Sequence, residues 1–139
     1  MSTFYGDVMS KTFAAQIGDW ADRTEDKMLR VAQASIQDVM TIAQTTVAQG
    51  GNMPVDTGFL RNSLVSSLDG AEVAQGEDSY TLAIAGMQLG QPMQFAWTAE
   101  DYAIPRHYAV GVGQGGGLWR DLAAAQWQDL VTKNAAAVR

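Results

Sequence analysis

Cysteine is absent from the 139-residue chain, and histidine occurs once, at position 107. Disulfide frameworks, thiolate metal sites and cysteine nucleophiles are therefore excluded, and so is a metal site built from several histidines. Charged residues make up only 17% of the sequence, and its acids outnumber Lys and Arg by 15 to 9. The resulting net charge of −6 argues against nucleic-acid binding across a broad basic face, because that needs clustered Lys and Arg.

No secretory signal or membrane-spanning segment is expected. Residues 1–7 contain an acid and no basic residue, unlike the start of a signal peptide. The longest uncharged stretch, 79–99, is interrupted by glycines, glutamines and a proline, which a spanning helix avoids. Hydrophobic residues nevertheless make up 47% of the chain, so one folded domain with a sizeable core is expected.

A long helix is predicted near the N-terminus. Apolar residues recur at spacings of three and four from Leu29 to Val47, which is one face of an amphipathic helix. This helix is placed over residues 19–49. Asp19 or Asp22 is its expected N-terminal cap, and Gly50-Gly51 is its expected stop.

The middle of the chain changes to the two-residue period of β-strands. Alternation predicts strands at Tyr80–Ile84 and Met93–Thr98, with weaker strands at Val65–Leu68 and Glu72–Gly76. The glycine-rich stretch that follows, 111–117, is expected to be a mobile loop.

The end of the chain predicts a second amphipathic helix over 118–138, with Trp119 and Trp127 in the core. The fold class is therefore predicted to be α+β: a long N-terminal helix, a small antiparallel sheet of three to four strands, and a C-terminal helix. Residues 1–18 are assigned to an arm or short helix, and residues 19–139 to a single α+β domain.

Signals for catalysis are weak. The glycines of 111–117 have the spacing of a dinucleotide-binding loop, but no hydrophobic strand precedes them, so no cofactor is expected. His107 has the chemistry of a general base and has Asp101 and Glu100 nearby, yet no nucleophile motif accompanies it. No catalytic residue and no metal ligand is assigned. A small cytosolic enzyme using His107 with Asp101 or Glu100 is kept as an alternative.

The most distinctive string is Pro54-Val55-Asp56-Thr57-Gly58-Phe59-Leu60-Arg61-Asn62-Ser63. It resembles the signature of the small neck proteins of long-tailed bacteriophages, the head–tail joining or tail-completion family. The order along most of the chain is also similar: a long helix, the signature, a few strands, a tyrosine–alanine pair and a closing helix. The pair stands here at Tyr102-Ala103 and again at Tyr108-Ala109.

The string also has a local physical interpretation. Asp56 or Thr57 is suited to cap the turn that follows, and Gly58 lets the chain pivot closely. Leu60 is expected to be buried against the long helix. Arg61 is expected to point away from it.

Arg61 is the residue of the string without an obvious local partner. Between Asn62 and Pro105 the sequence has six acids and no Lys or Arg. A neighbouring copy of the chain is therefore expected to offer Arg61 a carboxylate such as Glu100 or Asp101. A solvated arginine, or one paired with Asp56, is the alternative.

The resemblance implies a non-enzymatic virion protein of the neck or tail that is present in the host cytoplasm during assembly. Its implied partners are copies of itself in a ring, expected to number six, and neighbouring head-closure, tail-terminator or tail-tube proteins. DNA would pass through the lumen without specific binding. An α+β adaptor unrelated to phages is a further alternative. The implied interface residues are Asp56, Thr57, Gly58, Leu60, Arg61, Tyr102, His107 and Tyr108.

Overall fold

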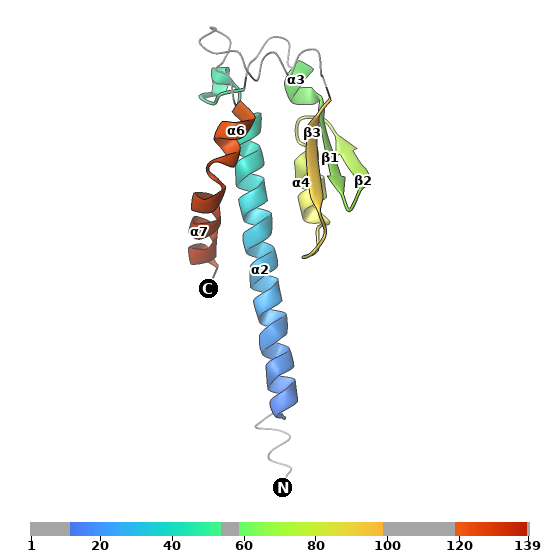
Figure 1. Cartoon of the computed structure of the whole chain (residues 1–139), viewed down its shortest axis with the longest axis vertical. Helices are drawn as coiled ribbons and strands as arrows, with labels where there is room; N and C mark the ends of the chain where they lie inside the picture. The colour runs from blue at the N-terminus through green and yellow to red at the C-terminus, as the bar shows by residue number, and fades with distance from the viewer. Residues whose placement is uncertain (1–11, 54–58, 99–118, 139) are drawn as a thin grey trace.

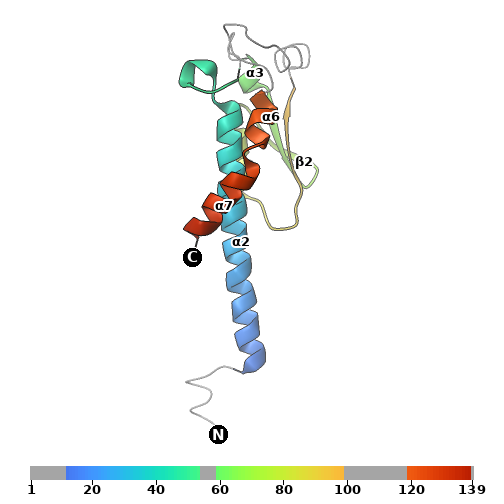
Figure 2. The same cartoon turned by 60° about the vertical axis from the view of Figure 1, so that its left-hand side comes forward.

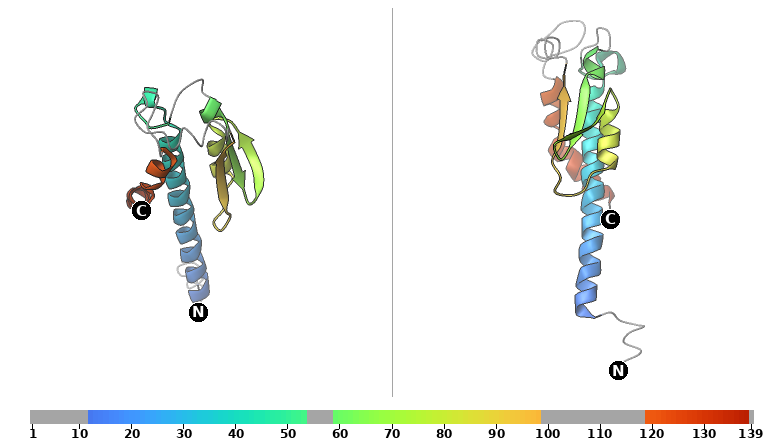
Figure 3. Two further views of the ribbon diagram at one scale, coloured as in Figure 1. Left: turned by 45° about the horizontal axis from the view of Figure 1, so that its top comes forward. Right: turned by 90° about the vertical axis from the view of Figure 1, so that its right-hand side faces the viewer.

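The computed structural model describes residues 12–53, 59–98 and 119–138. Within these ranges the chain has an α+β fold made of a long helix α2, a three-stranded antiparallel sheet and the C-terminal helices α6 and α7 (Figure 1). The predicted fold class is confirmed. The sheet and helix α4 lie on one side of α2, whereas α6 and α7 lie on another, so α2 supports both (Figures 1 and 3).

Helix α2 spans Phe13–Gln44 and begins earlier than predicted. Its N-terminal cap is Thr12, whose Oγ1 accepts a hydrogen bond from the backbone N–H of Ala15 at 3.1 Å. The predicted caps Asp19 and Asp22 therefore lie inside the helix. The predicted boundary between arm and domain also falls within α2.

The C-terminal end of α2 also differs from the prediction. The helix ends at Gln44, Thr45 is extended, and a short 3₁₀ helix, η1 (Val47–Gln49), follows. Gly50 ends η1 with a φ of 94°, in the left-handed region that glycine adopts without steric cost. The glycine pair therefore terminates the 3₁₀ turn rather than the long helix.

The sheet contains three of the four predicted strands. These are β1 (Leu64–Leu68), β2 (Ala71–Gln75) and β3 (Met93–Trp97), in the order β2-β1-β3 with both pairings antiparallel. Asp69-Gly70 forms the predicted turn between β1 and β2, and both residues have positive φ, as a two-residue hairpin turn requires.

The predicted strand at Tyr80–Ile84 is wrong, because this segment is helix α4 (Ser79–Ala85). The alternation of apolar residues was a coincidence over a short run, since Leu82 is 62% exposed. Burial follows the helical spacing instead, with Tyr80, Ala83 and Ile84 on the covered face.

The main hydrophobic core lies between α2, α4 and the sheet. Side chains of α2 from Leu29 onward pack against it, as the helical spacing predicted. Its buried members are Met40, Leu64, Tyr80, Ile84 and Met87.

The closing helix is divided into α6 (Trp119–Ala124) and α7 (Trp127–Ala137). Trp119 is buried, as predicted, but Trp127 is 41% exposed and the prediction that it lies in the core is wrong. The break between the two helices turns α7 along α2, so a single stripe through both tryptophans does not face one partner (Figure 2).

Candidate functional site

The described part of the signature string begins with the one-turn helix α3 (Phe59–Asn62) ahead of the sheet. Leu60 is 1% exposed and packs in a small cluster with Met53 and Trp119. Trp97 packs on this cluster and meets Trp119 edge to face, with ring centroids 4.6 Å apart. Leu60 was expected to be buried and was also placed among the interface residues. It is buried, in a cluster that joins the signature to the C-terminal helix.

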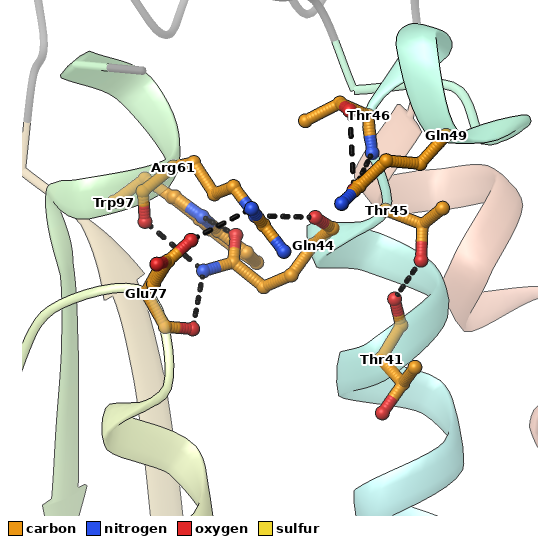
Figure 4. Close-up of polar contacts among 8 residues, drawn as sticks. All are labelled: Thr41, Gln44, Thr45, Thr46, Gln49, Arg61, Glu77 and Trp97. Carbon is orange, nitrogen blue, oxygen red and sulfur yellow. Dashed lines mark hydrogen bonds and ion pairs between the residues drawn. The ribbon is translucent and has the colours of Figure 1, made fainter.

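Gln44, the last residue of α2, is the polar centre of the same region (Figure 4). Its Nε2 donates hydrogen bonds to the backbone carbonyls of Arg61 and Glu77, both at 3.0 Å. Its Oε1 accepts a hydrogen bond from the indole Nε1 of Trp97 at 2.8 Å. One buried amide therefore ties the end of α2 to α3, to the turn before α4 and to β3.

Arg61 closes this arrangement with two contacts of its own. Its Nε donates to the backbone carbonyl of Gln44 at 2.9 Å, and its Nη1 lies 2.7 Å from Oε2 of Glu77 (Figure 4). The expectation that Arg61 points away and lacks a local acid is wrong. The acid is Glu77, which the fold brings beside it. We call Gln44, Arg61, Glu77 and Trp97 the junction.

Ser63, the last residue of the signature, also serves the fold. Its hydroxyl donates to the carbonyl of Leu60 at 2.7 Å. Its own carbonyl accepts two hydrogen bonds from Thr98, from the backbone N–H at 3.1 Å and from the hydroxyl at 2.9 Å. These bonds fix the end of β3 against α3.

The chain between α2 and the signature is held in a tight loop. The backbone N–H of Met53 donates to the carbonyl of Thr45 at 3.2 Å, and the N–H of Val47 donates to the carbonyl of Met53 at 3.0 Å. A side chain at Gly51 would collide with the carbonyl of Thr45, so only glycine fits there. These backbone hydrogen bonds hold Met53, the residue before the signature, against the residues that follow α2.

A second polar cluster attaches α7 to α2. Asn134 donates from Nδ2 to Oγ of Ser35 at 3.2 Å and to Oδ2 of Asp38 at 3.0 Å. The ammonium of Lys133 lies 3.0 Å from the same carboxylate oxygen. Hydrogen bonds from Asn134 and then Lys133 lower the pKa of Asp38, against the opposing effect of its partial burial.

Several predicted residues lie outside the described ranges. Of the predicted interface residues, these are Asp56, Thr57, Gly58, Tyr102, His107 and Tyr108. Glu100, Asp101 and the glycine-rich loop 111–117 lie outside them too. The pairing of Arg61 with Glu100 or Asp101 of another copy is replaced by the observed pairing with Glu77.

Sequence reasoning missed Gln44, Glu77 and Trp97 as partners of the signature. Gln44 carried a usable signal, because it follows Met40 by four residues and so places an amide on the apolar face of the helix. No feature of the sequence pointed to Glu77 as a partner, since it is sixteen residues from Arg61 and is one of six acids between residues 62 and 105.

The arrangement binds chain segments to one another. The donors and acceptors of the junction are directed at backbone carbonyls and at each other, which fixes the geometry of the segments that carry them. Within residues 12–53, 59–98 and 119–138, no group of three or more His, Cys, Asp or Glu could hold a metal ion. Among the helices that the structure describes, none is both long enough and apolar enough to cross a membrane.

Fold and junction together define a small α+β protein in which one long helix carries a sheet on one side and a helical tail on another. No protein-family model matches the chain, and no curated protein or solved structure matches it either. The likeness to phage neck proteins therefore depends on the signature string and on the order of the elements around it.

Proposed function

We propose that the chain is a structural protein of the neck or tail of a tailed bacteriophage, a head–tail joining or tail-completion protein. The observation that carries the proposal is the string Pro54–Ser63, which resembles the signature of that family. Its position after a long helix and before the strands follows the family's order as well.

The contacts of the signature support a structural role. Leu60, Arg61 and Ser63 each have a partner within the fold, so their presence needs no catalytic explanation. A subunit that joins two different proteins must keep its shape while both of its binding surfaces are occupied. A junction in which one buried amide, that of Gln44, ties three elements to one helix end provides that rigidity.

The charge distribution supports a ring through which DNA passes. Asp69, Glu72 and Asp78 are exposed, and no Lys or Arg occurs between residues 62 and 98. Acidic side chains turned toward the lumen would repel phosphate groups and leave DNA unbound. The proposed assembly is a ring of six copies that contacts head-closure, tail-terminator or tail-tube proteins.

A nonsense allele of the gene, in the phage or prophage that carries it, tests this proposal. Electron micrographs of the lysate should show filled heads and finished tails that have not joined. Supplying the natural chain in trans should restore joined particles, as should the control variant Leu82→Ala, which changes an exposed side chain away from the junction. Joined, infectious particles made without the protein would overturn the proposal.

A further inference from the structure

The N-terminal half of α2 exposes a stripe of large apolar side chains. These are Phe13, Ile17, Trp20 and Met28, which are 78%, 49%, 60% and 55% exposed. At about 100° of rotation per residue, all four lie within an arc of about 80°. Thr24 completes the stripe, and its hydroxyl donates to the carbonyl of Trp20, within its own helix. We call these five residues the stripe.

The half of α2 that carries the stripe extends beyond the rest of the fold. Among the described residues, the hydrophobic core meets α2 from Leu29 onward. Figures 1 and 2 show residues 13–28 continuing past the sheet, α4 and the end of α7. A helical segment of about four turns is marginal in water without packing, and contiguous exposed apolar surface marks interaction sites in folded proteins.

The stripe continues a face of α2 that is covered by α7 nearer the C-terminal end of the helix. Ser35 follows Ile17 by eighteen residues, and Asp38 follows Trp20 by the same number, which is about five full turns. Ser35 and Asp38 are the residues that Asn134 of α7 contacts. The stripe therefore lies on the face of α2 on which α7 packs, in the N-terminal part of the helix that α7 does not reach.

We propose that the stripe is covered by the same stripe of a second copy of this chain, lying antiparallel to it. In this arrangement the α2 helix of the partner packs on the same face of α2 as α7 does, but nearer the N-terminus, beyond the end of α7. A parallel arrangement would instead bring the two α7 helices into the same space, since both lie on that face. The two stripes match in length by symmetry, as a two-fold interface requires.

Charges beside the stripe fit the antiparallel orientation. Centring the pair near Trp20 places Phe13 of one copy opposite Met28 of the other. One flank of the stripe carries Asp19, Arg23 and Lys27 in that order. In an antiparallel pair, Asp19 of each copy lies near Arg23 of the other copy, so two such acid–base pairs form in each dimer.

The contact is small. Two stripes of four large side chains bury less than the standard interface of roughly 1,600 Å². The expected dimer is therefore concentration-dependent, with Trp20 at its centre as the anchor residue. The inference concerns the free chain and does not depend on the proposed role in the virion.

Sedimentation of the full chain over a dilution series tests the association. A monomer–dimer equilibrium is expected, and Trp20→Ala should weaken it roughly 100-fold because the symmetric interface loses two anchors. The matched control Leu82→Ala, 62% exposed on α4, should leave the dissociation constant unchanged. A chain that stays monomeric at high micromolar concentration, or an equal effect of both variants, would overturn the proposal.

Single cysteines test the orientation, because the natural chain has none. Ala21→Cys, near the centre of the contact, should oxidise to a disulfide-linked dimer. Phe13→Cys alone should not, whereas a mixture of Phe13→Cys and Met28→Cys should. Self-linking of Phe13→Cys would show a parallel pair and overturn the antiparallel one. A virion ring held by other surfaces would survive Trp20→Ala. Loss of the free dimer in this variant is therefore distinguishable from a failure of heads and tails to join.

Discussion

Both halves of α2 carry apolar side chains at helical spacing, but these lie on different faces of the helix and have opposite surroundings. Toward its C-terminal end the helix is covered by the core, by α7 and by the junction around Gln44. Toward its N-terminal end the side chains of Phe13 and Trp20 are more than half exposed. Apolar spacing therefore identifies an amphipathic helix, but it does not say which of its apolar side chains this chain covers.

The largest expected difference between the halves is in packing. Leu60→Ala, which empties a fully buried site beside the covered end of α2, should reduce the free energy of unfolding by about 3 kcal/mol. Ile17→Ala in the exposed half should change monomer stability by less than about 0.5 kcal/mol. Urea unfolding of both variants at concentrations where the chain is monomeric measures the two free energies. Similar losses of stability in the two variants would contradict the difference between the covered and the exposed half of α2.

A smaller loss is expected from the buried amide of the junction. Gln44→Ala leaves the Trp97 indole N–H and two backbone carbonyls without their partner, which should cost about 2 kcal/mol. Gln128→Ala, an exposed glutamine of α7, is the control and should be near neutral. Thermal melts of the two variants decide the matter, and equal midpoints would show that the amide does not hold the junction.

Reversing the charge of Arg61 should have a moderate effect. Arg61→Glu removes the bond to the Gln44 carbonyl and sets two carboxylates together, at a cost of about 1 kcal/mol for a pair that is partly exposed. The change is expected to act within the chain because Arg61 pairs with Glu77 of the same chain. Combining it with Glu77→Arg should recover part of the loss in urea unfolding. No recovery in the double variant would count against the observed pair.

The smallest effect concerns the attachment of α7. Because the pKa of Asp38 is lowered in the folded chain, its contribution to stability is present above its ordinary value of 3.8 and is lost as the pH falls through the lower, folded value. The stability difference between the natural chain and Asp38→Asn should therefore narrow below about pH 4. A difference that stays constant down to about pH 2 would contradict this assignment.

Much of the fold followed from local pattern, and the errors have physical causes. The long helix, the hairpin at Asp69-Gly70 and the strand β3 depend on periodicity and turn chemistry, which are local. Helix α4 was missed because seven residues are too few to separate a two-residue period from a helical one. Thr12 was missed as a cap because the amphipathic pattern used for the prediction began at Leu29.

The junction could be predicted only in part. Leu60 was expected to be buried, and it is. The partners of Arg61 were not foreseen, because the contact with Glu77 depends on how the turn before α4 meets the end of α2. Gln44 shows the same limit, since its three hydrogen bonds reach segments 17 to 53 residues away in the sequence. Long-range pairing of this kind is set by the assembled fold.

Hydrogen exchange along α2 at two protein concentrations tests the contrast between its halves most directly. Amides in the covered half, near Met40, should exchange slowly at both concentrations because they open only with the fold. Amides of residues 17–28 should exchange quickly in dilute protein and slow markedly as the concentration rises and the stripe becomes covered. Uniform protection along the whole helix, unchanged by concentration, would contradict the account.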